Sequence, residues 1–215
     1  QGDDITTNPG SNKQAAAEID RFAPVNSNKG VKDCWSDHYA IIKAANFIIQ
    51  NASKTPTDAA SLNQAIGQAK FWRAYAYFTL VRLFGDIPLT LTNENDDFTM
   101  KPSSVEQVYE QIVADLTSDE CEGLPASYKN APAFLNGVNV YVTKQAVEAT
   151  RAAVYMAMAG WPLEKGTAYY KKAADEAKKV IEGERNGTYD IRMDENFYDV
   201  YAMSNNCLLY TSDAA

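Results

Sequence analysis

Residues 68–89 read QAKFWRAYAYFTLVRLFGDIPL and predict a helix that other helices enclose. Its apolar side chains surround the helix: Phe71, Tyr75 and Phe78 lie on one side, and Trp72, Ala76, Tyr77, Leu80, Val81 and Phe84 occupy the rest. A surface helix has a single apolar stripe, so this helix is predicted to lie in a core, with Trp72 inside it. Gly85 supplies the left-handed residue that ends such a helix, and Pro88 prevents it from resuming.

The same stretch carries residue types in a distinctive order. The order begins with a small residue, a basic residue and an aromatic residue at 69–71. It continues with RAY at 73–75, an aromatic pair at 77–78, LVRL at 80–83 and FGDIPL at 84–89. Matching positions continue in chain order on both sides: Trp35, Tyr39, Ile42, Ala45 and Asn46 upstream, and 104–116, Leu124, Pro125, 143–156 and 170–181 downstream. This distributed pattern resembles the SusD/RagB family.

The resemblance implies a fold and a function. SusD-like proteins are outer-membrane lipoproteins of Bacteroidota that capture nutrients, mostly glycans, at the cell surface for a TonB-dependent, SusC-like transporter. Their fold is all-α, with tetratricopeptide-like helical hairpins and long irregular loops. The resemblance therefore implies a glycan-binding protein that takes part in polysaccharide utilisation, with a lipid anchor in the intact protein.

The two ends of the chain differ from the rest. Residues 207–215, CLLYTSDAA, resemble a transposase sequencing adaptor read as protein, so we exclude them from fold reasoning. The start has no initiating Met, no apolar signal segment and no lipobox Cys. We therefore expect residues 1–206 to form part of a SusD-like helical domain, truncated at both ends.

Helix boundaries follow from caps and breakers. Six helices are expected, at about 12–22, 31–52, 58–84, 105–117, 143–159 and 165–182. Thr57 or Asp58 is predicted to cap the third, and Ser103 or Ser104, with Glu106 or Gln107 behind it, to start the fourth with a capping box. The connection 118–142 has only a short β-like segment, at 138–142, and a loop of this length is often functional.

The last two expected helices resemble a tetratricopeptide hairpin. Small residues recur on both: Ala146, Ala149, Ala153 and Ala157 on the first, and Ala168, Ala173, Ala174 and Ala177 on the second. Gly160 lies at the turn between them. We expect the alanines to form the contact between two antiparallel helices, as in helical repeats.

Composition excludes several classes of protein. The chain has 215 residues and a net charge of −8, which argues against nucleic-acid binding because phosphate contacts need clustered Lys and Arg. No apolar run approaches the length of a membrane span. Cys34 and Cys121 are expected to be a small core residue and a loop thiol, although a disulfide between them stays open.

The residues offer little for catalysis. His38 is the only histidine, so the chain cannot assemble a His-based metal site or a Ser-His triad, and we expect it at an exposed position beside Asp37. Acidic pairs such as Asp96-Asp97 lie in polar loops, where carboxylates are normally solvated. We expect no enzyme activity, no cofactor and no metal.

Sugar-binding proteins stack aromatic rings on sugar faces and bind hydroxyls with amides and carboxylates. On this basis the candidate ligand-binding residues are Asp4, Asn28, Trp35, Tyr128 and Tyr141. Packing of Trp35 against the 58–84 helix is an equally good interpretation. The alternative function is a tetratricopeptide-type scaffold that binds only protein. Exposed aromatics beside amides and carboxylates would favour a sugar, whereas aromatics in an apolar groove would favour a peptide helix.

Overall fold

The computed structural model describes residues 7, 10, 13–93, 99–129, 134–135 and 138–191. The helices within these ranges are α1 (Gln14–Asp20), α2 (Lys29–Asn51), α3 (Ala59–Phe84), α4 (Val105–Leu116), α5 (Asp119–Glu122), α6 (Lys144–Ala159) and α7 (Thr167–Arg185), with one 3-10 turn at Ala52–Lys54. Strand structure in this part of the chain consists of β1 (Phe134–Leu135) and β2 (Val138–Asn139), which pair antiparallel. The expected all-α fold is confirmed.

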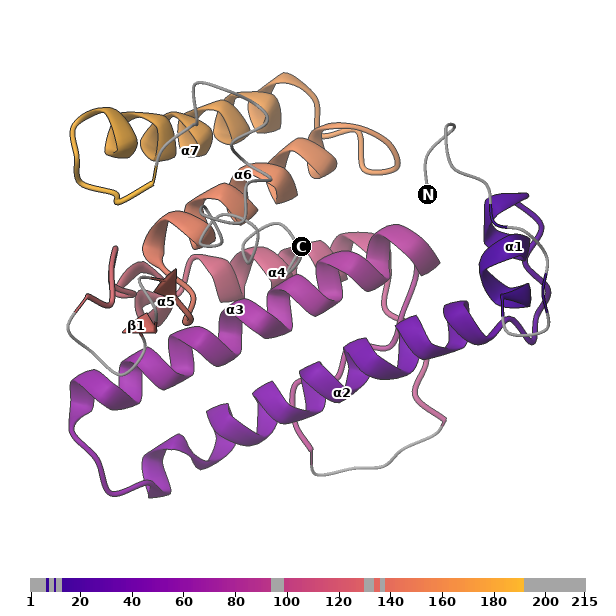
Figure 1. Ribbon diagram of the computed structural model, residues 1–215, viewed down its shortest axis with the longest axis horizontal. Coiled ribbons are helices and arrows are strands. Elements are labelled where there is room, and N and C mark those ends of the chain that lie inside the picture. Colours follow the sequence, from indigo (N-terminus) through magenta and orange to yellow (C-terminus); the bar gives the residue numbers. More distant parts are fainter. Residues whose placement is uncertain are drawn as a thin grey trace.

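The helices pack in chain order into a layered stack. The hairpin of α2 and α3 lies on one side, α4 packs on α3, α6 packs on α4, and α7 packs on α6 (Figure 1). α1 lies at the amino-terminal end of α2 (Figure 1). Ile42, Tyr77, Leu80, Ile112 and Val154, from four different helices, are fully buried between these layers. None of the helices in the described ranges is both long and apolar enough to cross a membrane.

The predicted caps explain where helices begin and end. The Asp58 side chain accepts a hydrogen bond from Ser61 N at 2.9 Å, and Ser104 forms a full capping box with Gln107. Side-chain acceptors at these positions satisfy backbone N–H groups that have no partner within the helix. Gly85 ends α3 with φ +72°, a conformation that favours glycine. The exit turn then pairs Ile87 with Ser103, which leads the chain into α4.

The α6–α7 hairpin forms as expected, but only some of its alanines lie at a helix contact. Ala149 and Ala153 are exposed, whereas larger side chains such as Val147, Val154 and Met158 face the interior of the stack. α6 contacts both α4 and α7, so large side chains are needed to fill the space on its inner face. Ala149 and Ala153 therefore lie on the outer surface of α6, whereas Ala146 and Ala157 are half-buried against the core.

Arg73 joins three helices at the centre of the stack. Its side chain is 6 % exposed. Nε and Nη2 donate to the two carboxylate oxygens of Asp115 on α4 at 2.8 and 2.7 Å, and Nη1 donates to Asn46 Oδ1 on α2 at 2.8 Å. Asn46 in turn donates to Thr90 O at 3.0 Å. A buried guanidinium that is paired in this bidentate way is satisfied without water.

Neither cysteine has the role expected of it. Cys121 lies on α5 and is fully buried, and burial raises the pKa of its thiol to about 11. Cys34 is only half-buried on α2. Both thiols are free, so the structure contains no bridge between them. The short helix α5 folds the loop against α3, which no local pattern in the sequence indicated.

Candidate functional site

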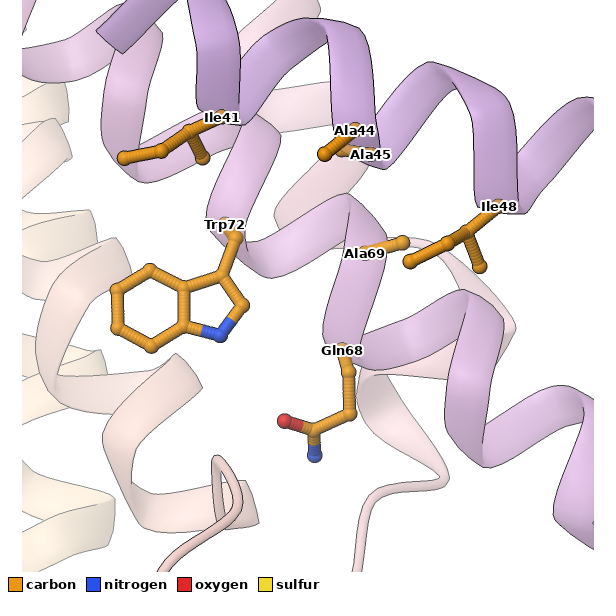
Figure 2. Close-up of a pocket in the computed structure, with 7 residues that line it drawn as sticks. All are labelled: Ile41, Ala44, Ala45, Ile48, Gln68, Ala69 and Trp72. Atoms are coloured by element: carbon orange, nitrogen blue, oxygen red, sulfur yellow. The ribbon is translucent and has the colours of Figure 1, made fainter. Parts of the chain in front are cut away.

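An apolar groove runs between α2 and α3 (Figure 2). α2 contributes Ile41, Ala44, Ala45 and Ile48, and α3 contributes Gln68, Ala69 and Trp72. Its volume is about 330 Å³. Ile41, Ile48 and Trp72 each keep more than a third of their surface exposed, so the groove is an open apolar surface. Open apolar surface of this kind commonly marks an interaction site.

Trp72 corrects the prediction that it lies in the core. It is 39 % exposed, whereas its neighbours Phe71 and Arg73 are buried. Its indole ring points away from α2, whose Ile41, Ala44 and Ala45 line the opposite side of the groove (Figure 2). Phe71 and Tyr75 instead contact Trp72 from its own helix. Trp72 therefore forms part of an apolar surface groove and is not a core residue.

Gln68 is the polar residue of the groove, and its amide is already used. Its Nε2 donates to the hydroxyl oxygen of Tyr128 at 3.0 Å and to the carbonyl oxygen of Val142 at 2.8 Å. Its Oε1 accepts a hydrogen bond from Val142 N at 2.9 Å. These bonds attach the end of the long connection to α3. By itself the groove thus offers apolar contacts, which suit an apolar partner better than a polyhydroxylated one.

Asn28 and Trp35 have structural partners. Asn28 is 3 % exposed and caps α2 by accepting from Val31 N at 3.1 Å, and its amide donates to Glu18 Oε2 at 2.7 Å. Trp35 packs edge-on against Phe84, the last residue of α3, with ring centroids 5.0 Å apart. The second interpretation of Trp35, packing on the 58–84 helix, describes what the structure shows. Asp4 lies outside the described residues.

Tyr128 and Tyr141 are brought together, with ring centroids 5.7 Å apart. Tyr128 is buried and donates to Val142 O at 2.7 Å. Burial raises the pKa of this phenol, which therefore stays protonated as a donor. Tyr141 is 52 % exposed. Of the five predicted ligand residues, Tyr141 is the aromatic that presents most of its surface to solvent.

The structure gives His38 a local partner. Its Nδ1 lies 2.7 Å from Cys34 O, and the residue is half-buried, which differs from the exposed position expected of it. Within the described ranges, no group of three or more His, Cys, Asp or Glu side chains is arranged to hold a metal ion.

Comparison with known proteins identifies the family. A family model described as starch-binding and associating with the outer membrane matches residues 4–156. The chain belongs to this SusD-like family. The SusD-like protein P2 of Formosa agariphila is 33% identical over 189 residues, which cover 86% of this chain and 33% of that protein.

Solved SusD-like structures share the fold. A SusD homolog from Bacteroides thetaiotaomicron is 26% identical and superposes with a TM-score of 0.69, covering 83% of this chain and 34% of its own. A structure with a xylogluco-oligosaccharide is 22% identical, with a TM-score of 0.74, and covers 94% of this chain and 38% of its own. The chain thus spans about a third of the length of these SusD-like relatives.

Proposed function

We propose that the intact protein binds a glycan at the cell surface, without cleaving it, and delivers it to a TonB-dependent, SusC-like transporter of the outer membrane. The observation that carries this proposal is the family match over residues 4–156, a family described as starch-binding and outer-membrane-associated. The relative solved with a xylogluco-oligosaccharide supports a glycan as the ligand class. In this proposal a lipid anchor in the intact protein attaches it to the membrane.

The binding half is tested with the complete gene product. Affinity electrophoresis through gels that contain plant or host polysaccharides is expected to retard it in at least one gel. Product analysis of the same mixtures is expected to show no new reducing ends. Release of reducing ends by pure protein would overturn the proposal that it is not an enzyme, and migration unaffected by every polysaccharide would overturn glycan binding.

The delivery half is tested through the partner. The neighbouring genes are expected to include one for a TonB-dependent transporter, and the two proteins are expected to co-purify from outer membranes. A gene product that fractionates away from both the outer membrane and the transporter would contradict this half alone.

One observation favours a second candidate function, a scaffold that binds only protein. The exposed aromatic Trp72 lies in an apolar groove, which suits the apolar face of a helix. Ile48→Glu places a charge in this groove and is expected to abolish such docking, while Glu110→Ala, on exposed surface of α4, is the control. Co-purification of a helical protein partner that Ile48→Glu removes, with no glycan bound, would favour the scaffold.

A further inference from the structure

A polar pocket of about 280 Å³ lies where α3 begins, beside α5. Asn63 and Gln64 of α3 line one side, and Asp119 and Glu120 of α5, with Gly123 and Pro125, line the other. Amides and carboxylates are the groups that bind sugar hydroxyls, since each provides donors or acceptors in a fixed direction. The pocket therefore has the polar half of a sugar site.

Two of these side chains have hydrogen-bonding capacity to spare. Glu120 forms an ion pair with Lys70, whose Nζ lies 2.6 Å from Glu120 Oε2. Burial raises the pKa of the Glu120 carboxyl, but the pairing with Lys70 outweighs burial, so the pKa is lowered overall. Asn63 and Asp119 are exposed at the pocket wall, and no described residue bonds their side chains. Asn63 and Asp119 are thus available to a ligand, while Glu120 keeps the wall in place.

The aromatic half of a sugar site lies alongside. Gln68, one helical turn after Gln64 of the pocket, donates from Nε2 to the hydroxyl oxygen of Tyr128 at 3.0 Å. The ring of Tyr128 packs edge to face with the exposed ring of Tyr141. The end of the long connection thus presents an exposed aromatic ring that is linked through Tyr128 to Gln68, one turn after Gln64 of the pocket.

A buried acceptor without a partner lies on the first turn of α6. Gln145, on the first turn of α6, donates from Nε2 to Ala126 O at 3.0 Å, one residue beyond Pro125 of the pocket. Its Oε1 is buried and has no hydrogen-bond partner. A buried amide oxygen in this state costs free energy unless a donor reaches it, as a hydroxyl group or a water molecule would.

We infer that this pocket and Tyr141 together bind a neutral oligosaccharide. Asn63 and Asp119 bind the hydroxyls of one sugar ring, and a neighbouring ring stacks on Tyr141. The inference rests on the proposed function and adds the place and the contacts of binding. It assigns a role to the 118–142 connection, whose two ends both contribute to the site.

The test measures binding of xylogluco-, laminari-, cello-, manno- and malto-oligosaccharides to the complete gene product by isothermal titration calorimetry. Asn63→Ala, Asp119→Ala and Tyr141→Ala are each expected to weaken binding of the preferred oligosaccharide about tenfold, which corresponds to about 1.4 kcal/mol. Tyr141→Phe keeps the ring and is expected to bind within about twofold of the unsubstituted protein, since stacking needs the ring alone.

Matched controls lie on α7. Tyr170 is 48 % exposed, close to the exposure of Tyr141, and Asp175 is an exposed carboxylate like Asp119. Tyr170→Ala and Asp175→Ala are expected to leave the affinity unchanged. The melting temperature of each variant is measured and is expected to be unchanged. Asn63 lies on the long helix α3, so the Asn63→Ala result does not depend on whether the short helix α5 stays folded.

The outcomes separate the two proposals. Oligosaccharide binding that all three pocket variants leave unchanged would overturn this inference while leaving glycan capture intact. Failure of the unsubstituted protein to bind any oligosaccharide of the series or any polysaccharide would overturn glycan capture, and this inference with it. Weakening by the pocket variants and not by the α7 controls supports both.

Discussion

Arg73 is a charged residue buried between three helices. It bridges α2, α3 and α4 through Asp115 and Asn46. Removing one partner of a buried ion pair leaves the other charge uncompensated, which is costlier than the pair itself. This position therefore has a role in stability, because a guanidinium buried among aromatic residues needs a partner.

Arg73→Ala is expected to lower the free energy of unfolding by about 3 kcal/mol or more, because Asp115 stays buried without its cation. Urea denaturation followed by circular dichroism measures this change. Lys171→Ala removes an exposed ion pair with Asp175 and is expected to cost less than about 1 kcal/mol. An Arg73→Ala protein with native stability but no affinity for glycan would instead identify Arg73 as a ligand-binding residue.

The buried thiol of Cys121 makes stability depend on pH. Its pKa is about 11 in the folded chain and 9.0 in its ordinary state, because burial disfavours the thiolate. The folded state thus favours the protonated thiol. The resulting stabilisation is fully present below pH 9.0, where the unfolded chain is also protonated, and it is lost as the pH rises through about 11.

The unfolding free energy of the unsubstituted chain is expected to fall more steeply at alkaline pH than that of Cys121→Ala. Between pH 9.0 and about 11, the unfolding free energy of the unsubstituted chain should fall by roughly 2 to 3 kcal/mol more than that of Cys121→Ala. Buried tyrosines such as Tyr77 also lose stabilisation in this range, but they contribute equally to both proteins. Parallel pH profiles for the two proteins would contradict this account.

Gly67 lies at the contact between α3 and α5, and the distance between these two helices depends on it. A Cβ atom built at this position would lie 2.5 Å from the carbonyl oxygen of Glu120. That oxygen belongs to the backbone, so α5 as a whole would have to move. Glycine at this point therefore allows α3 and α5 to approach closely.

Gly67→Ala distinguishes packing from helix propensity, because the two effects have opposite signs. Alanine favours a helix by about 1 kcal/mol over glycine. The clash with α5 is expected to exceed this gain and to give a net destabilisation of about 1 to 3 kcal/mol. Ala65→Gly, at an exposed position of α3, measures the propensity difference alone. A more stable Gly67→Ala protein would show that α5 yields easily.

The outer surfaces of the stack differ in character. The α2–α3 side carries the apolar groove, whereas α7 presents mainly charged residues, with Ile181 and Tyr170 exposed among them. Helical repeats bury their apolar faces against neighbours, and a terminal repeat normally has a polar outer face. A chain with such an open groove is expected to bind hydrophobic dyes and to aggregate at high concentration.

Removal of residues 207–215 tests our interpretation of the adaptor-like segment, which lies outside the described residues. A chain of residues 1–206 is expected to melt at the same temperature as the full chain, because a translated adaptor has no evolved packing partner. Differential scanning calorimetry of both chains measures the difference. A fall of more than a few degrees would mean that these residues pack as native structure, and our interpretation would be wrong.

Local patterns in the sequence were sufficient for most of the helical framework. The end of α3 at Gly85 was predicted correctly, and the caps at Asp58 and Ser104 are each one of the two residues that the sequence offered. These features depend on residues within one helical turn. The distributed residue pattern was also sufficient to identify the family.

Tertiary contacts decided how the surface is used. Whether Trp72 is buried depends on how α2 and α3 pack, and the burial of Cys121 depends on how α5 folds back on α3. The candidate sugar site depends on Gln68, which binds Tyr128 and Val142 from 60 and 74 residues away. Apolar periodicity shows that a residue has a partner, but only the three-dimensional packing determines whether that partner is the core, a groove or a ligand.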